Sequence, residues 1–404
     1  MNKKKILVLS TYPIKNPQHG GQKRTYAIVD AYRQHFAQVR HSAVFFRPFY
    51  AEHEADDIPL GRDSEHKVMS SPLTGDVVCG EAIFEDGVVK RKMTSLLRSF
   101  APDIIHIEQP FPYLGLKPLL KELQLSPRLV FGSQNIEAPM KREILEGAHV
   151  EEAQIRQAEK LITDLEAELS RASDLVVACT PSDLEAHKRM GAKHVVLAPN
   201  GVSRPHIDPQ AVRYWQDKFQ DMGVNRKILF VGSAHPPNWT GFLQMVGKGL
   251  GFLPYDARII AAGSISDYFE REVNADAPDI DDATFWLRAF ATGRLSEDRL
   301  AALITLGDVI LLPITEGGGS NLKTAEAILA DKKVVATSHA LRSFEWFKDF
   351  PNVWVADTKP TFIRSIQAAL DASHAARSAQ QAKLAHQVEW QQCLKAMVDR
   401  VGAL

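Results

Sequence analysis

The sequence predicts an α/β protein made of two domains, each built on a doubly wound sheet of parallel strands. The chain has 404 residues, a length that favours two domains, each with its own core. Short apolar runs rich in β-branched residues alternate with helical stretches, and such runs are typical of strands buried on both faces of a parallel sheet. Near the middle, "APNGVSRPHIDP" (198–209) interrupts this alternation and is typical of a linker.

The first domain is expected to span residues 1–200. Its predicted strands are "KILVLST" (5–11), "VRHSAVFF" (39–46), "IIHIEQ" (104–109), "RLVFGSQ" (128–134), "LVVACT" (175–180) and "HVVLAPN" (194–200). Residues 151–172 predict a long amphipathic helix that packs its apolar stripe on this domain. Residues 47–88 have no clear periodicity and are interpreted as an irregular insertion.

The second domain is expected to span residues 201–376. Its predicted strands are "KILFVGS" (227–233), "ARIIAAG" (257–263), "TFWLRAF" (284–290), "VILLPI" (309–314), "KVVATS" (333–338) and "VWVAD" (353–357). Residues 377–404 predict a terminal helix that returns to the first domain. Two such domains place a cleft between the carboxyl ends of their strands, where open α/β sheets bind ligands.

The composition excludes several classes of protein. The formal net charge of −1 argues against a nucleic-acid partner, since such proteins are usually basic. Cys79, Cys179 and Cys393 are odd in number and scattered, which favours reduced thiols over a disulfide or zinc framework. The apolar run after the basic N-terminus is too short for a signal peptide, and no window reaches the roughly 18 apolar residues of a membrane span. We therefore expect a cytoplasmic protein.

The stretch "EGGGSNLKTAEAILA" (316–330) carries the clearest candidate binding site. It follows an apolar strand and opens a predicted helix, whose unpaired N–H groups and dipole favour an anion. The glycines let the backbone approach a ligand, Ser320 is the predicted N-cap, and Lys323 adds a charge suited to phosphate. The candidate residues are Gly318, Gly319, Ser320, Asn321, Lys323 and Glu326.

Glu326 is suited to a different task from that of Lys323. A carboxylate does not favour an anion, but it accepts hydrogen bonds from hydroxyl groups. An anion site beside a hydroxyl acceptor fits the diphosphate and ribose of a nucleotide-sugar. The alternative is an ordinary glycine-rich loop with Lys323 and Glu326 as a solvated i,i+3 pair.

These residues resemble the donor-binding loop of GT-B glycosyltransferases, particularly glycosyltransferase family 4. Members show a Gly-Ser-Gly/Asn-x-x-Lys-x-x-Glu-Ala pattern before Lys-x-Val-Val-Ala-Thr. Further matching stretches, in the expected order, are 10–25, 102–109, 198–202, 230–242 and 291–313. The resemblance implies the GT-B fold, a nucleotide-sugar donor used as substrate, no other cofactor, and retention of anomeric configuration. It also implies that Ser233 and Asn238 lie at the donor and that the backbone at Arg294 and Leu295 lies near its nucleobase.

The chain departs from the family pattern at two places. Many relatives have a glutamate eight residues before the one matching Glu326, where this chain has Gly318; Glu316 is out of register. Many relatives also carry an arginine and a lysine after the first strand of the second domain, but "SAHPPNWTG" (233–241) has neither. Phosphate binding is therefore expected to depend on Lys323, the glycines and the helix start near Asn238.

In the first domain, "HGGQKRT" (19–25) follows the first strand. The resemblance places this loop near the reacting sugar, and Gly20 and Gly21 allow close backbone approach. The alternative for Lys23 and Arg24 is the solvated face of a helix start. His106, at the end of the third strand with Glu108, is a candidate catalytic residue or else a packed, hydrogen-bonded histidine.

Asn135 and Glu137 follow the next strand, where many relatives place a histidine or an acidic residue that matters for catalysis. Glu137 would act as a base if the enzyme inverts, or orient the acceptor hydroxyl if it retains. The alternative is that the two residues cap a helix.

No metal site is predicted, because no Asp-x-Asp motif stands at a strand end; "DDIP" (56–59) and "DIDDA" (279–283) are interpreted as solvated acidic turns. The stretch "VVKRKMTSLLRSFAP" (88–102) predicts a basic amphipathic helix. Such a helix either lies on an anionic membrane or packs its apolar stripe on the sheet.

Together these features predict a cytoplasmic, metal-independent hexosyltransferase-type glycosyltransferase acting on a saccharide or lipid-linked saccharide, as in polysaccharide biosynthesis. Peripheral contact with the inner face of the membrane would suit the lipid-linked acceptor. Two alternatives remain: a nucleotide-sugar epimerase-like GT-B enzyme, and a catalytically silent GT-B protein that binds a glycan or a partner.

Overall fold

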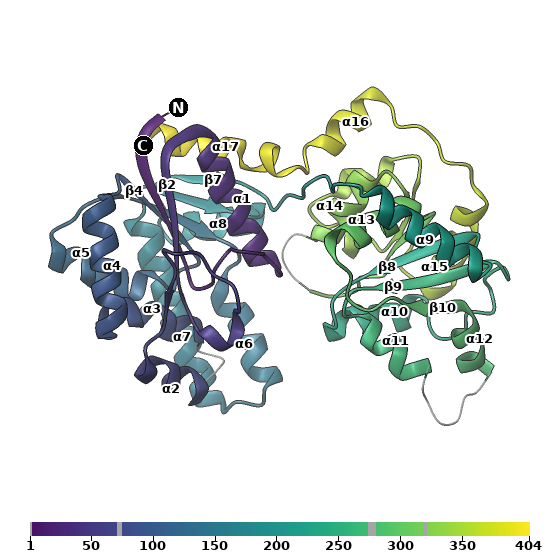
Figure 1. The fold of residues 1–404 in the computed structure, drawn as a ribbon, viewed down its shortest axis with the longest axis horizontal. Coiled ribbons are helices and arrows are strands. Elements are labelled where there is room, and N and C mark those ends of the chain that lie inside the picture. Colours follow the sequence, from purple (N-terminus) through teal and green to yellow (C-terminus); the bar gives the residue numbers. More distant parts are fainter. Residues whose placement is uncertain (1, 71–74, 274–279, 318–320) are drawn as a thin grey trace. The chain divides into compact units, whose positions relative to one another are not determined.

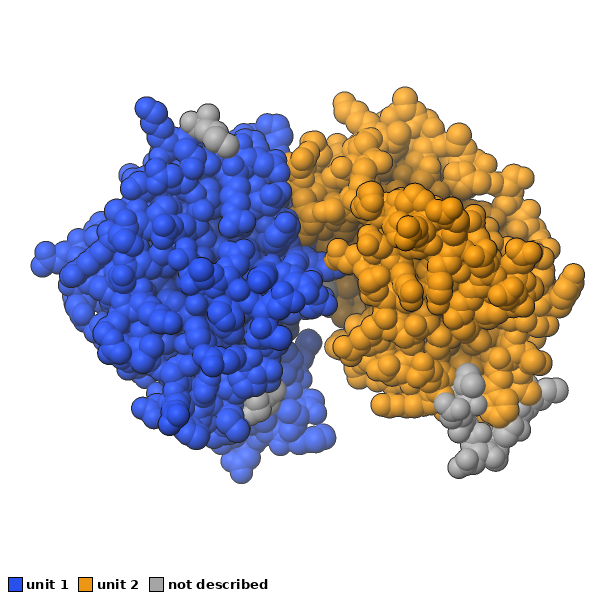
Figure 2. All heavy atoms as spheres, viewed as in Figure 1, with its two compact units in different colours: residues 1–200, 393–404 blue, residues 201–392 orange. Residues whose placement is uncertain are grey.

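The computed structural model describes residues 2–70, 75–273, 280–317 and 321–404 (Figure 1). The chain forms two compact units (Figure 2): unit 1 contains residues 1–200 and 393–404, and unit 2 contains residues 201–392. The chain thus passes from one unit to the other twice, after Asn200 and after Gln392.

Unit 1 is built on a parallel sheet of seven strands in the order β3-β2-β1-β4-β5-β6-β7. The strands are β1 (Asn2–Ser10), β2 (Phe36–Phe45), β3 (Ile58–Pro59), β4 (Ile104–Glu108), β5 (Arg128–Ser133), β6 (Leu175–Ala178) and β7 (Val195–Leu197). The helices are α1 (Gly20–His35), α2 (Arg62–Ser70), α3 (Gly75–Glu85), α4 (Gly87–Phe100), α5 (Tyr113–Leu123), α6 (Glu137–Gly147), α7 (Glu152–Ala172), α8 (Pro181–Arg189) and α17 (Trp390–Ala403), with a 3₁₀ turn η1 (Arg47–Phe49).

Unit 2 is built on a parallel sheet of six strands in the order β10-β9-β8-β11-β12-β13. The strands are β8 (Arg226–Val231), β9 (Ala257–Ala262), β10 (Ala289–Ala291), β11 (Val309–Leu312), β12 (Lys333–Ala336) and β13 (Val353–Val355). The helices are α9 (Pro209–Asp221), α10 (Pro236–Met245), α11 (Ser266–Val273), α12 (Ile280–Arg288), α13 (Glu297–Leu306), α14 (Leu322–Ala330), α15 (Lys359–Asp371) and α16 (Ala379–His386), with 3₁₀ turns η3 (His339–Leu341) and η4 (Glu345–Asp349).

The predicted fold class is confirmed, and strand burial explains it. Consecutive residues of β1, such as Ile6, Leu7 and Val8, are all fully buried, although successive side chains of a strand point to opposite faces. Both faces of the sheet must therefore be covered, as the helices of an α/β unit do.

Four local predictions were wrong. The acidic stretch 56–59 is not a solvated turn, because Asp57 is buried and accepts from Ala43 N (2.8 Å), and Ile58–Pro59 form β3. Most of the predicted strand 284–290 is the end of α12, and only β10 is extended; a short apolar run is compatible with either a buried helix or a strand. Residues 47–88, predicted to be irregular, contain β3, α2 and α3, and α3 buries Cys79 and Ile83. The terminal segment forms two helices rather than one, because Val202 N donates to Val388 O (2.9 Å) in the stretch between them.

Helix α4 forms where the basic amphipathic helix was predicted. Its apolar residues Val89, Met93, Leu97 and Phe100 belong to the core of unit 1. The stripe therefore packs on the domain and is not available to enter a membrane. No helix in the described part of the chain is both long and apolar enough to cross a bilayer.

Candidate functional site

In unit 2, the candidate loop joins β11 to α14. Helix α14 begins at Leu322 with Asn321 as its N-cap residue, one residue later than predicted. The Asn321 side chain does not cap the helix; its Nδ2 donates to Ala340 O (3.2 Å) and ties the helix start to the turn after β12. Gly318, Gly319 and Ser320 lie outside the described residues.

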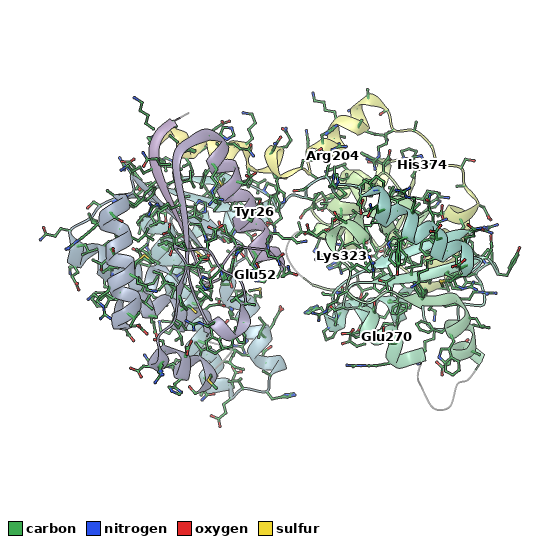
Figure 3. All side chains as sticks on the ribbon, in the orientation of Figure 1. Tyr26, Glu52, Arg204, Glu270, Lys323 and His374 are labelled. Carbon is green, nitrogen blue, oxygen red and sulfur yellow. The ribbon has the colours of Figure 1, made fainter. Side chains whose placement is uncertain are left out.

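Lys323 is the central side chain of this site (Figure 3). Its Nζ donates to Asn238 Oδ1 (2.6 Å) in the first turn of α10. Asn238 in turn donates from Nδ2 to Ser233 O (2.9 Å), at the carboxyl end of β8. The structure therefore brings together three predicted residues from two strand ends.

Partial burial makes Lys323 an unusual lysine. Burial lowers the pKa of Lys323 to about 8; the charge of Glu326 opposes this shift, and the charge of Arg342 adds to it. A lysine with this pKa is close to losing its charge near neutral pH, and an anion at the amine would restore the charged form.

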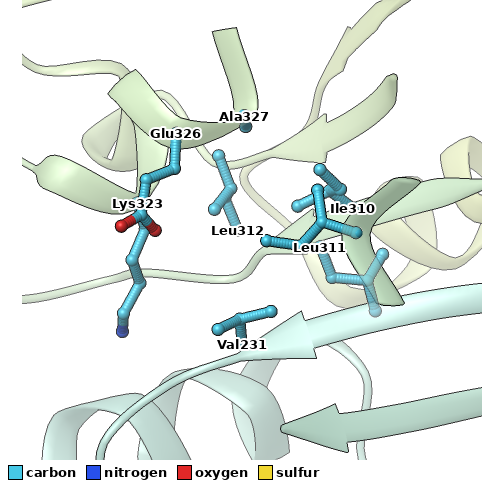
Figure 4. A pocket seen from close by; sticks show the side chains of 8 residues that line it. Val231, Ile310, Leu311, Leu312, Lys323, Glu326 and Ala327 are labelled. Carbon is cyan, nitrogen blue, oxygen red and sulfur yellow. The ribbon is translucent and has the colours of Figure 1, made fainter. Parts of the chain in front are cut away.

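Glu326 is exposed, one turn along α14 from Lys323. Both side chains line a small pocket under the helix, whose apolar wall comes from β8 and β11, including Val231 and Leu312 (Figure 4). Glu326 is thus accessible to a hydroxyl group at the edge of the site.

Arg294 and Leu295 follow β10, after Gly293, which has a φ of +70°. Gly293 N donates to Ser266 Oγ (3.0 Å), which fixes this turn at the carboxyl edge of the sheet. Arg294 is exposed and Leu295 packs against the core, so a ligand there would meet mainly backbone.

Sequence reasoning missed a cation at this edge. Arg342 lies just after η3, and its Nη1 donates to His339 O (3.0 Å). The His339 ring bonds through Nε2 to Gly317 O (3.1 Å), and Gly317 has a φ of +102°. The available signal was "SHALR" (338–342), a basic stretch directly after the strand β12.

In unit 1, the polar residues at the sheet centre form a buried network. His106 is fully buried: its Nδ1 bonds Tyr32 Oη (2.7 Å) and its Nε2 bonds Glu108 Oε1 (2.8 Å). Burial alone would raise the pKa of Glu108, but the hydrogen bond from His106 and the charge of Arg24 hold it below its ordinary value. His106 therefore occupies the packed, hydrogen-bonded position rather than a strand end open to a ligand.

Two glycines make room for this network. A Cβ on Gly132 would stand 1.9 Å from Glu108 Oε1, so only glycine fits opposite the pair. A Cβ on Gly21 would stand 2.8 Å from Gln134 Oε1. Gly21 thus serves internal packing, whereas Gly20 is exposed at the start of α1.

Arg24 is buried, which contradicts the interpretation that it lies on a solvated face; Lys23 is exposed. Arg24 Nη1 donates to Ala198 O (2.9 Å) and Asn200 Oδ1 (3.0 Å). Arg24 thus anchors the last residues of unit 1 before the chain leaves it.

Glu137 is the first residue of α6 and is fully buried. Among the residues that the structure describes, neither of its carboxylate oxygens has a hydrogen bond of good geometry, although the Gln109 side chain is near enough to lower the pKa slightly. Burial raises the pKa of Glu137 to about 7, while Lys141 opposes this shift and Asp76 adds to it. A carboxyl group of this kind can exchange a proton near neutral pH.

The predicted capping pair does not form. The residue that caps α6 is Glu166 on α7, whose carboxylate accepts from Glu137 N (2.8 Å) and Ala138 N (3.3 Å). Asn135 is half-buried, and its carbonyl accepts from Ser133 Oγ (2.9 Å).

Further polar groups surround Glu137 at the carboxyl ends of β1 and β4. Lys141 pairs with Asp76 (2.6 Å), and Thr11 Oγ1 donates to Asp76 Oδ1 (3.0 Å) and Gln109 Oε1 (3.1 Å). Gln109 has a φ of +63°, a strained value for a residue other than glycine.

In the described ranges, no three His, Cys, Asp or Glu side chains are grouped so as to hold a metal ion.

Comparison with known proteins agrees with this architecture. Residues 31–204 match the family model described as Glycosyltransferase Family 4. HepE from Anabaena, crystallised with UDP, superposes with a TM-score of 0.64 at 14% identity, covering 99% of this chain and 100% of that one. Sucrose-phosphate synthase from Thermosynechococcus elongatus gives 0.64 at 13% identity, with 99% and 98% covered.

The catalytic domain of starch synthase IV from Arabidopsis thaliana, bound to ADP and acarbose, superposes with a TM-score of 0.58 at 12% identity, covering 99% of this chain and 98% of that one. No protein of curated function shows a significant match to the sequence. At these identities the superpositions establish the fold: the chain has the GT-B fold and resembles glycosyltransferase family 4 over the matched residues.

Proposed function

We propose that this protein is a glycosyltransferase that moves a sugar from a nucleotide-sugar donor to a saccharide or lipid-linked saccharide acceptor. The observation that carries the proposal is Lys323, held by Asn238 at the carboxyl edge of a parallel sheet beside the start of α14. Structural relatives that share the fold were solved with UDP or ADP, which are the nucleoside diphosphates of such donors.

In this proposal unit 2 binds the donor. Lys323 and the N–H groups at the start of α14 hold the diphosphate, and Glu326 accepts hydrogen bonds from the ribose hydroxyls. The backbone at Arg294 and Leu295 lies against the nucleobase. Positive charge at the diphosphate stabilises the negative charge that develops as the sugar leaves, and such electrostatic stabilisation is usually the largest catalytic contribution.

The reaction breaks the bond between the sugar anomeric carbon and the diphosphate oxygen and forms one bond from that carbon to an acceptor oxygen. The acceptor hydroxyl loses its proton, and the nucleoside diphosphate leaves with the bonding electron pair. We propose that the reaction proceeds with retention and without a metal ion, as the resemblance to family 4 implies. Lys323 would then supply the positive charge on the leaving diphosphate that a bound metal ion supplies in metal-dependent enzymes.

Glu137 is the proposed acceptor-side residue. Because its carboxyl group is fully buried, Glu137 would orient the acceptor hydroxyl or receive its proton through the polar groups beside it, such as Gln109 and Lys141; its pKa of about 7 suits this exchange. We place the protein in the cytoplasm, where nucleotide-sugars would be available to it as donors.

The test begins with calorimetric titration of the protein with UDP, ADP and GDP and with their sugar conjugates. Lys323→Ala should weaken nucleoside diphosphate binding by about 10- to 100-fold, the loss expected for a hydrogen bond between charged groups. Lys332→Ala is a matched control, because Lys332 is also a partly buried lysine of unit 2 with a lowered pKa, but it donates to Thr305 O.

Unchanged affinity in Lys323→Ala would show that the proposed donor site is wrong. Incubation of the best donor with acceptor extracts then separates the functions. Sugar transfer supports the glycosyltransferase, interconversion of the free nucleotide-sugar would identify an epimerase-like enzyme, and binding without turnover would identify a silent protein.

A further inference from the structure

The turn after β12 folds against the donor loop of unit 2. Ala340 O accepts two hydrogen bonds from α14, from Asn321 Nδ2 (3.2 Å) and from Thr324 Oγ1 (2.6 Å). His339 bonds Gly317 O on the other side of the loop. The turn is thus fixed to both ends of the glycine-rich segment, and it carries Arg342 with it.

The guanidinium group of Arg342 lies near the backbone of Gly317. While Nη1 donates to His339 O, Nη2 stands 3.8 Å from the position that a Cβ on Gly317 would occupy. Because glycine has no side chain, no Cβ or larger group separates the guanidinium from the backbone of Gly317. A ligand phosphate that binds along this backbone would lie within reach of the arginine.

The backbone next to Arg342 is strained. Ser343 has a φ of +71°, which costs free energy for a residue other than glycine. The hydrogen bond from Ser343 N to Glu345 Oε1 (3.0 Å) holds this conformation. Strain of this kind is concentrated at functional sites, and here it lies directly after the cation.

Two cations of the same partly buried site oppose each other. The charge of Arg342 lowers the pKa of Lys323, and burial lowers the pKa of Arg342 itself. Holding two like charges together costs free energy, which an anion bound between them would offset. A diphosphate is such an anion, and a guanidinium binds phosphate oxygens in pairs.

We infer that Arg342 is a second diphosphate-binding residue of the donor site, acting with Lys323. This inference rests on the proposed function. It also accounts for a departure noted above: residues 233–241 lack the cations that many relatives place after the first strand of this domain, and Arg342 supplies a positive charge from the turn after β12 instead.

The test is titration of wild type and Arg342→Gln with UDP, ADP and GDP. The variant should lose about 10- to 100-fold in affinity, as expected for a charge-assisted hydrogen bond to phosphate. Arg342→Lys, which keeps the charge, should lose less. Arg377→Gln is the control, because Arg377 is also a half-buried arginine of unit 2, but it pairs with Asp331 (2.7 Å).

Proton linkage tests whether the charge of Arg342 acts on Lys323 within the same site. Since the free Lys323 has a pKa of about 8, wild type at pH 8.5 should take up part of a proton when the diphosphate binds. Without Arg342 the pKa of Lys323 rises, so Arg342→Gln should take up less. Calorimetry in two buffers of different ionisation enthalpy measures this uptake.

The outcomes separate the two proposals. If Lys323→Ala binds weakly while Arg342→Gln keeps wild-type affinity and proton uptake, the inference is wrong and the proposed donor site stands. If wild type binds none of the three diphosphates, both are wrong. Should Arg342→Gln fail to fold, the affinity of Arg342→Lys decides the question, because lysine keeps the charge but cannot bind two phosphate oxygens in the manner of a guanidinium. Wild-type affinity in Arg342→Lys would overturn the inference.

Discussion

The burial of Glu137 both lowers the stability of the folded protein and gives the residue the raised pKa on which its proposed role in the reaction depends. Its carboxyl group is buried without a hydrogen bond of good geometry in the described part of unit 1, and its pKa is raised to about 7 from an ordinary value of 4.5. Between these two values the folded protein binds the proton more tightly than the unfolded chain does. The stability contribution of Glu137 therefore falls as the pH rises through this window.

Glu137→Gln should accordingly stabilise the protein at pH 8, by about 1–3 kcal/mol, and give no gain below pH 4.5. The same variant should lose most sugar transfer, because it can no longer exchange a proton. Urea unfolding at pH 8 and pH 4.5, together with a transfer assay, measures both effects. A variant that is less stable at pH 8 would mean that Glu137 has a structural role.

At the residue scale, the sequence showed which side chains stand at strand ends but not their surroundings. The sequence shows that Glu137 is acidic and follows a strand. Its raised pKa, however, depends partly on Asp76 of α3 and Glu166 of α7, which are distant in the sequence. His106 was visible too, but its burial depends on Tyr32 from α1. Arg342 was missed because no local pattern indicates that the turn after β12 folds onto Gly317.

At the scale of elements, α6 depends on a cap supplied by another helix. Its N-cap residue, Ile136, has no side chain able to accept a hydrogen bond, and Glu166 accepts two backbone N–H groups instead. Burial raises the pKa of Glu166 to about 7, while the hydrogen bonds from these two N–H groups oppose the shift. The α7 helix thereby sets where α6 begins, and with it the position of Glu137.

Glu166→Ala should destabilise the protein by about 1–2 kcal/mol at pH 4.5, the usual cost of a lost N-cap. Above pH 7 the loss of a buried carboxylate offsets part of this cost, because the pKa of Glu166 is also raised to about 7. Urea unfolding at pH 4.5, where Glu137→Gln gives no gain, therefore isolates the effect of the cap. Unchanged stability in Glu166→Ala would show that α6 does not depend on the cap.

The elements themselves were largely predictable, since continuous apolar runs of β-branched residues have few alternatives when both faces of a sheet are covered. The failures have a physical reason. The run at 284–290 contains Phe and Trp, which suit a helix packed on a sheet as well as a strand, and residues 47–88 take their order from contacts such as Gly80 against Phe111 O. Contacts of that kind do not appear in local periodicity.

At the scale of the whole molecule, unit 1 includes a helix from the far end of the chain. From α17 it buries Leu394, Met397 and Val401, and Asn2 Nδ2 donates to Gly402 O (3.2 Å). All six tryptophans, in contrast, lie in the segment 201–392, so tryptophan fluorescence reports mainly on unit 2; the exception is Trp390, which begins α17.

Met397→Ala should therefore destabilise unit 1 by about 2–4 kcal/mol, the usual cost of truncating a fully buried methionine. Urea unfolding followed by circular dichroism should show a transition at lower urea, while the main fluorescence transition, from the five tryptophans outside α17, stays in place. Lys395→Ala, on the exposed face of the same helix, should change neither curve. A parallel shift of both signals would mean that the units unfold together.

The double passage of the chain also affects how the protein is made on the ribosome. Domains generally complete their folding in the order of synthesis, the N-terminal one first. Here unit 2 is continuous, whereas unit 1 lacks the α17 side of its core until residues 393–404 have been added. Although its first strand is translated at the outset, unit 1 is the later of the two to be completed, and until then the surface that α17 covers stays open to chaperones.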